Sequence, residues 1–229
     1  MIPSKTRRLA VSVAAALALA AGSGASRGAA QTAAQPASTS QDEAAAIAAA
    51  RADSARYPYT AADIHFMTGM IPHHAQAIVM AGWAPSHGAS ASVQTLASRI
   101  INAQQDEIRT MRNWLRDRQQ PVPDSTSMTM SMPMNGADHE MLMPGMLTAA
   151  QMKQLDAARG EQFDQLFLRF MIQHHRGAIS MVQDLFDSYG AAQNPTVFKI
   201  ASDINVDQTT EVARMQKMLA SLLFGTPTQ

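Results

Sequence analysis

The chain has 229 residues with 18 basic and 18 acidic side chains, so it lacks the basic surplus of a nucleic-acid-binding surface. It contains no cysteine, which excludes disulfide scaffolds, zinc–thiolate sites, iron–sulfur clusters and thiol catalysis. Against this stand 17 methionines and 7 histidines. Thioether and imidazole groups therefore supply nearly all of the chain's capacity for soft metal ligands.

Residues 1–30 have the pattern of an export signal. Lys5, Arg7 and Arg8 precede an apolar run over residues 9–21, which is too short to span a bilayer and is followed by small residues. Removal of residues 1–30 takes away four basic residues and no acid, which leaves a net charge of about −4. No later stretch is apolar enough for a transmembrane helix, so we expect a soluble periplasmic or secreted protein without membrane insertion.

Helical patterns account for most of the remaining chain. Residues 31–59 are rich in Ala, Ser and Gln and predict a flexible tether with a short helix at 42–55. Residues 121–146 contain four prolines and two glycines and predict a loop. No segment alternates apolar and polar residues as a strand does, so the predicted fold class is all-α. The predicted helices cover residues 60–81, 92–119, 148–188 with an interruption near 160, and 196–224.

A duplication underlies these helices. Residues 66–80 and 167–181 agree at eight positions with a constant offset of 101, and both contain a Met-Ile-x-His-His sequence. The helices that follow repeat as well, because Gln104-x-x-Glu107 returns as Gln208-x-x-Glu211. Two helical hairpins that each have one apolar face bury it best against each other, which predicts a four-helix bundle over residues 60–224. The predicted parts are repeat one at 60–120, a crossover at 121–146 and repeat two at 148–224.

The repeated motifs place metal-ligating residue types on the core face of the bundle. At about 100° per residue, both histidines of each pair border the apolar stripe, and a glutamate on a core face needs a partner. One such set is typical of a hydrogen-bonded polar core, whereas two copies favour metal ligation, with the polar core as the alternative. The predicted bundle ligands are His73, His74, His174, His175, Met70, Met80, Met171, Met181, Glu107, Met111, Glu211 and Met215.

The predicted crossover is rich in methionine. Thioethers in an exposed, proline-containing segment gain nothing from packing, so their number favours coordination of Cu(I), which silver would mimic. Three alternatives stay open: the segment folds back over an apolar surface, it is a low-complexity insert, or its methionines trap oxidants. The predicted crossover ligands are Met128, Met130, Met132, Met134, His139, Met141, Met143 and Met146.

The two Met-Ile-x-His-His motifs, each followed by a Gln-x-x-Glu helix, resemble the bacterial family catalogued as domain of unknown function 305. The resemblance covers about residues 61–223, with residues 121–146 variable. It implies an exported, ferritin-like four-helix bundle. Some members are described as periplasmic copper-binding proteins, so the resemblance also implies copper tolerance as a function and the paired histidines and their neighbouring methionines as motif positions.

Three classes of function follow. The first is an exported protein that binds Cu(I), and also Cu(II), for sequestration, tolerance or transfer, with a copper donor or acceptor protein as partner and no catalytic residue. The second is a ferritin-like di-metal oxidase, for which only Glu107 and Glu211, with Asp63 and Asp164 near the helix starts, supply carboxylates. The third is a metal-free envelope-stress or interaction bundle.

Overall fold

The computed structural model describes residues 37–124, 130–134 and 137–225, and of residues 37–39, 130–134 and 137–141 it describes the backbone alone. The predicted export signal lies outside these residues. The all-α prediction is confirmed, and no helix in the described ranges is long and apolar enough to cross a membrane. The helices are α1 (Ala37–Arg56), α2 (Ala61–Gly82), α3 (Ala91–Asp117), α4 (Ala149–Ala157), α5 (Gly160–Asp187) and α6 (Pro195–Phe224).

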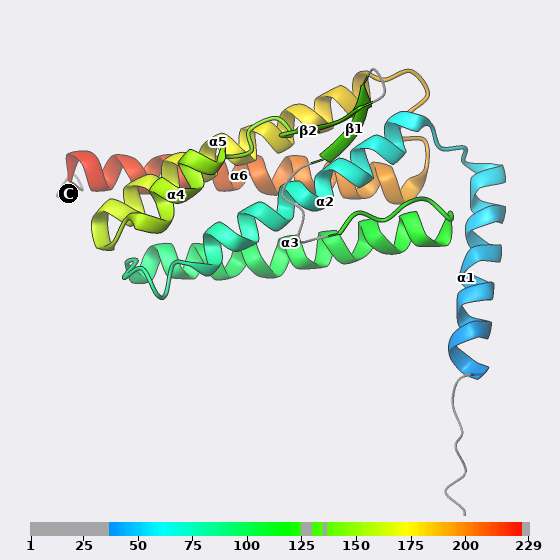
Figure 1. Cartoon of the computed structure of the whole chain (residues 1–229), viewed down its shortest axis with the longest axis horizontal. Coiled ribbons are helices and arrows are strands. Elements are labelled where there is room, and N and C mark those ends of the chain that lie inside the picture. The colour runs from blue at the N-terminus through cyan, green and yellow to red at the C-terminus, as the bar shows by residue number, and fades with distance from the viewer. Residues whose placement is uncertain (1–36, 125–129, 135–136, 226–229) are drawn as a thin grey trace, which may run out of the picture. The chain divides into compact units, whose positions relative to one another are not determined.

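Two helical hairpins make up the bundle (Figure 1). Helix α2 packs along α3, α5 packs along α6, and the hairpins meet mainly through α2 and α5. The predicted interruption near residue 160 is the break between α4 and α5, where Gly160 has a positive φ of 56°. Helix α1 is longer than the short helix predicted at 42–55, and its Asp53 bonds to Arg118 and to Asn194, one residue from each hairpin.

The carboxylates near the starts of α2 and α5 tie the hairpins together. Asp63 forms a capping box with Thr60, and its second oxygen accepts a 2.7 Å bond from the backbone N–H of Ala192 in the α5–α6 loop. Asp164 accepts the backbone N–H of Ser90 in the α2–α3 loop, at 3.1 Å and 3.2 Å to its two oxygens. Each hairpin therefore holds the connecting loop of the other, which gives these carboxylates a structural use away from any di-metal site.

Replacing Asp63 by alanine is expected to lower the free energy of unfolding by about 2 kcal/mol, because it removes the carboxylate of the capping box and leaves the buried N–H of Ala192 unpaired. Asp164→Ala should cost less, since Asp164 accepts from one backbone group. Urea denaturation of both variants measures the difference, with the exposed Asp106→Ala as the control. Equal losses in all three variants would contradict the proposed ties.

The apolar core consists of two clusters at opposite ends of the bundle. One contains Phe66, Met70 and Trp114 with the C-terminal half of α5, and the other contains Met80, Phe163 and Phe167. Between the clusters every bundle helix carries polar residues. We name these eight residues the central polar layer: His73, His74, Gln104, Glu107, His174, His175, Gln208 and Glu211.

Two described parts of the crossover are strands and not loop. Strands β1 (Met130–Met134) and β2 (Ala137–Met141) form an antiparallel hairpin in which Met130 pairs with Met141. The methionines at every second position of β1 form the period-2 pattern of a strand, which the prediction of a loop overlooked.

The end of the crossover is packed against α2 and α5. Gln76 of α2 accepts the backbone N–H of Leu147 at 2.7 Å and donates to its carbonyl at 3.0 Å. On α5 the matching position of the repeat is Gly177, and a Cβ there would lie 1.9 Å from the carbonyl oxygen of Pro144. The missing side chain of Gly177 therefore lets the crossover lie directly on the helix backbone.

Candidate metal centre

The four histidines of the duplicated motif come together in the central polar layer, where the structure buries all of them completely. The rings of His73 and His174 face each other across the α2–α5 contact, with centroids 3.8 Å apart. His74 and His175 flank this pair, with centroids 6.2 Å and 6.3 Å from the neighbouring ring of the same helix. The arrangement has the approximate two-fold symmetry that the sequence duplication predicts.

Each flanking histidine is paired with a glutamate of its own hairpin. Nε2 of His74 lies 2.6 Å from a carboxylate oxygen of Glu107 on α3, and Nε2 of His175 lies 2.6 Å from a carboxylate oxygen of Glu211 on α6. Both glutamates keep a small exposed fraction, 15% and 21% of the side chain. The carboxylates therefore connect the buried imidazoles to the surface and orient their rings, as the outer partners of metal-ligating histidines do.

Several ring nitrogens of the layer have no hydrogen-bond partner within the described part of the chain. These are both nitrogens of His174 and the Nδ1 atoms of His73, His74 and His175. Nε2 of His73 donates to the carbonyl of Pro144 at 3.0 Å, so its Nδ1 carries the free lone pair. Burying a ring nitrogen without a hydrogen-bond partner costs free energy, and a bound metal ion is one partner that would satisfy it.

The central pair is held neutral. Burial, with a smaller contribution from the charge of His74, lowers the pKa of His73 from 6.5 to about 3, against the opposing effect of its bond to Pro144. Burial and then the charge of His73 lower the pKa of His174 well below 6.5. Neutral imidazole is the form that binds metal, so both rings are in the ligating state at neutral pH.

A cleft of about 220 Å³ opens between α3 and α6 over the outer side of the layer. Gln104 and Gln208 line it, each only 3% exposed, and neither amide group has a hydrogen-bond partner among the described residues. Asp207 lies beside them, and burial, followed by the charges of Glu107 and Glu211, raises its pKa. Sequence reasoning missed Asp207, because the repeat carries Ala103 at the matching position.

The cleft has basic residues as well, since Arg99 and Arg214 also line it. Three carboxylates against two guanidinium groups leave the cleft acidic, which favours a cation over an anion. Two of the cleft's carboxylates, Glu107 and Glu211, contact the buried His74 and His175 directly.

The predicted bundle methionines are buried but do not encircle the histidines. Met70, Met111 and Met181 belong to one apolar cluster, and Met80, Met171 and Met215 belong to the other. In the described residues no three His, Asp or Glu side chains converge on one point with the geometry of a metal site. The ligand prediction for these methionines therefore stays a prediction.

The crossover ligands divide into two groups. The side chains of Met128, Met130, Met132, Met134, His139 and Met141 lie outside the described residues. Met143 and Met146 are not solvent-exposed as predicted, because both are buried in the apolar cluster beside α2 and α5. The alternative that the segment folds back over an apolar surface is correct for these two residues.

The structure is thus an all-α bundle of two similar hairpins around a layer of histidines, and it can be compared with known families. Residues 63–219 match the family described as Domain of unknown function (DUF305), and the chain belongs to this family. Among curated proteins, the uncharacterized protein L153 of Acanthamoeba polyphaga mimivirus is 39% identical over 56 residues, which cover 24% of this chain and 37% of that protein. The match thus spans little more than a third of that relative.

Solved structures of the family are similar over most of the bundle. A DUF305 fragment from Deinococcus radiodurans is 28% identical with a TM-score of 0.57, covering 71% of this chain and 98% of that one. A DUF305 protein from Streptomyces coelicolor, assigned as secreted, is 27% identical with a TM-score of 0.60, covering 73% and 98%. CopM in its Cu(I)-bound form is 27% identical with a TM-score of 0.54, covering 71% and 98%, and CopM structures with Cu(II) and silver are also similar.

Proposed function

We propose that this protein is an exported copper-binding protein that sequesters copper or passes it to a partner protein, without catalysing a reaction. The observation that carries the proposal is the pair of buried, neutral rings of His73 and His174, whose centroids are 3.8 Å apart and whose nitrogens include three without partners. The copper- and silver-bound structures of CopM, a related protein, support copper as the metal.

The two kinds of donor suit two oxidation states. Imidazole nitrogen and carboxylate oxygen in the central polar layer suit Cu(II), whereas the thioethers of the crossover suit Cu(I). The acidic cleft between α3 and α6 is the side from which a hydrated cation would reach the layer. Export, predicted by residues 1–30, would place the protein in the periplasm or outside the cell, where methionine resists the oxidation that converts thiols to disulfides.

A di-metal oxidase is less well supported, because Asp63 and Asp164 are engaged with connecting loops and leave only Glu107 and Glu211 in the layer. A metal-free bundle is favoured by one observation, the close His74–Glu107 and His175–Glu211 pairs, which give one nitrogen of each of these two rings a partner without a metal. The copper experiment separates this class from the proposal.

The test is a Cu(II) titration of the purified protein, followed by competition with a chelator and by electron paramagnetic resonance. We expect nitrogen hyperfine structure from imidazole, and at least a tenfold weaker affinity in a His73→Gln/His174→Gln variant. His87→Gln is the matched control, because His87 is also buried but bonds to Asp156 away from the layer. Circular dichroism verifies folding of both variants.

An anaerobic Cu(I) titration tests the crossover in the same protein. A variant with leucine at Met128, Met130, Met132 and Met134 should bind fewer equivalents of Cu(I) and retain its Cu(II) affinity. Copper binding no tighter than that of free imidazole or methionine in the unmodified protein would overturn the proposal and leave the metal-free bundle.

A further inference from the structure

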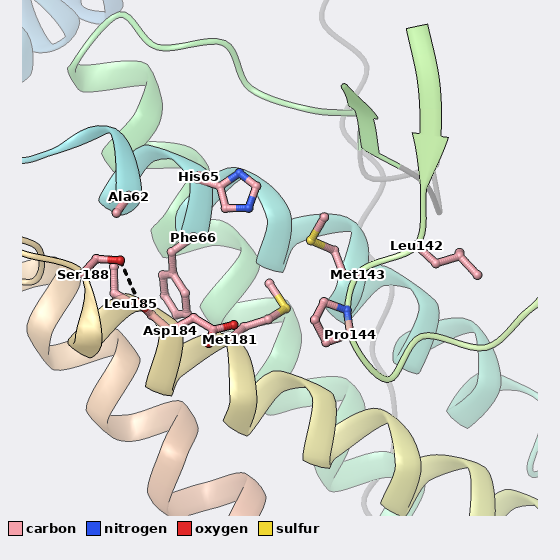
Figure 2. A pocket seen from close by; sticks show the side chains of 10 residues that line it. All are labelled: Ala62, His65, Phe66, Leu142, Met143, Pro144, Met181, Asp184, Leu185 and Ser188. Atoms are coloured by element: carbon pink, nitrogen blue, oxygen red, sulfur yellow. Dashed lines mark hydrogen bonds between the residues drawn. The ribbon is translucent and has the colours of Figure 1, made fainter. Parts of the chain in front are cut away.

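A pocket of about 420 Å³ lies where the end of the crossover meets α2 and α5. Its walls are mainly apolar, with Phe66 on α2 and Leu185 on α5 (Figure 2). Three of its lining side chains carry soft or borderline donor atoms, and they come from three separate segments: His65 of α2, Met143 of the crossover and Met181 of α5.

The three donors face the same space. In Figure 2 the thioether ends of Met143 and Met181 lie close to each other, and the imidazole of His65 lies on α2 beside them; all three line the pocket. Met143 and Met181 are each 7% exposed, whereas His65 is exposed. An ion could therefore meet the imidazole at the surface and the two sulfurs behind it.

The donor set matches a particular class of cation. Two thioethers and one neutral imidazole are soft and borderline ligands, which suit Cu(I) and Ag(I) and bind hard divalent ions poorly. Apolar walls exclude the water that would otherwise compete for the ion. Asp184, which also lines the pocket, supplies a nearby negative charge that balances a monovalent cation.

The duplication provides an internal comparison. The second repeat has Leu166 where the first has His65, and the first repeat has Met80 where the second has Met181. Met80 is completely buried in the other apolar cluster. Among the described residues, the second repeat therefore does not reproduce the combination of histidine and thioethers found where the crossover adds Met143.

The position of Met143 is also determined by packing. Pro144 lies directly against Gly177 and its carbonyl accepts a hydrogen bond from His73, so the residue before it is held at the pocket. Through Pro144 the pocket is one hydrogen bond away from the central polar layer.

We propose that His65, Met143 and Met181 form a binding site for one monovalent soft cation, Cu(I) or Ag(I), at the junction of crossover and bundle. This inference rests on the proposed copper function and specifies a second site for it, distinct from the histidine layer. The site lies at the end of the methionine-rich crossover, and its Met143 is next to Pro144, which is hydrogen-bonded to His73 of the central polar layer.

The test is a titration of the purified protein with Ag(I), followed by NMR of methionine methyl groups labelled with ¹³C. We expect the signals of Met143 and Met181 to shift together and to saturate, while the signal of Met152, which packs against the other apolar cluster, stays in place. His65→Ala, a change at an exposed position, should weaken binding at these two signals by about tenfold or more, the loss of one ligand. Met181→Leu should weaken binding in the same way, and Met152→Leu is its control and should leave the titration unchanged.

Each other outcome is decisive. Silver binding that shifts other methionines but leaves Met143 and Met181 in place would overturn this site and leave the proposed copper function intact. Shifts of both signals that are insensitive to His65→Ala would overturn the three-donor site. Absence of any silver or copper binding would overturn both this inference and the proposed function.

Discussion

Gly177→Ala is expected to lower the free energy of unfolding by about 2–3 kcal/mol, the upper part of the range for overpacking. A Cβ at this position would lie 1.9 Å from the carbonyl oxygen of Pro144 and 2.6 Å from Cα of Gly145, and all of these are backbone contacts that no side-chain rotation relieves. The crossover must move away from α5, which also breaks the bond between His73 and Pro144.

Urea denaturation of Gly177→Ala measures this loss. Gly82→Ala is the matched control, because Gly82 also lies in a helix but a Cβ there meets nothing within 4 Å. We expect the control to keep or slightly raise stability, since alanine is the better helix former. If the two variants have the same stability, the crossover does not lie on α5 as the structure places it.

Acid is expected to destabilise the metal-free protein well above the pH at which carboxylates titrate. The pKa of His73 is about 3 in the folded protein and 6.5 in the unfolded chain, so below pH 6.5 the unfolded state binds a proton that the folded state does not. Stability is therefore fully present above pH 6.5 and falls as the pH decreases towards 3. His174 has a shift of the same sign.

His73 contributes roughly 1 kcal/mol per pH unit, so it should cost roughly 1–2 kcal/mol between pH 6.5 and 5, and His174 adds a loss of the same sign. Urea denaturation at several pH values with a chelator present measures the slope of the free energy of unfolding against pH. His73→Gln/His174→Gln should flatten it, whereas the control His87→Gln should not. A slope that is the same in all three proteins would show that the central pair is not held neutral by burial.

Acid stability and copper binding are linked through the same rings. The burial that depresses the pKa of His73 also keeps its free Nδ1 unprotonated, so the proton competes with a metal ion for this nitrogen less effectively than for an exposed histidine. The cost is a polar layer in the middle of the core, whose unpartnered imidazole and amide groups weaken the metal-free bundle. Bound copper would return part of that stability by mass action.

Much of the fold was predictable because its signals are local and repeated. Helical periodicity with caps such as Thr60 and Asn194 located the helix starts, and the constant offset between the two histidine motifs predicted paired hairpins. The same offset predicted that His73 and His174 are equivalent by symmetry, and the structure brings their rings together. A partner for Glu107 was expected, but only the structure shows that it is His74 and not His73.

The crossover was less predictable, because its position depends on residues far away in the chain. Composition alone favoured a solvent-exposed segment, yet Met143 and Met146 are buried. What decides this is the space left by Gly177 and the double hydrogen bond from Gln76, two residues that occupy the same position in the two repeats. The sequence around Gln76 or Gly177 does not indicate that these residues contact the crossover.

By itself, the sequence determined the all-α class, the duplicated hairpin and the residue types that can bind a soft metal, since each depends on periodicity or composition along the chain. Only the tertiary structure decided that the histidines form one layer while the bundle methionines divide between two apolar clusters, and that His65 shares a pocket with Met143 and Met181. Those groupings depend on how helices are placed against one another, and that placement is set by packing between residues distant in sequence.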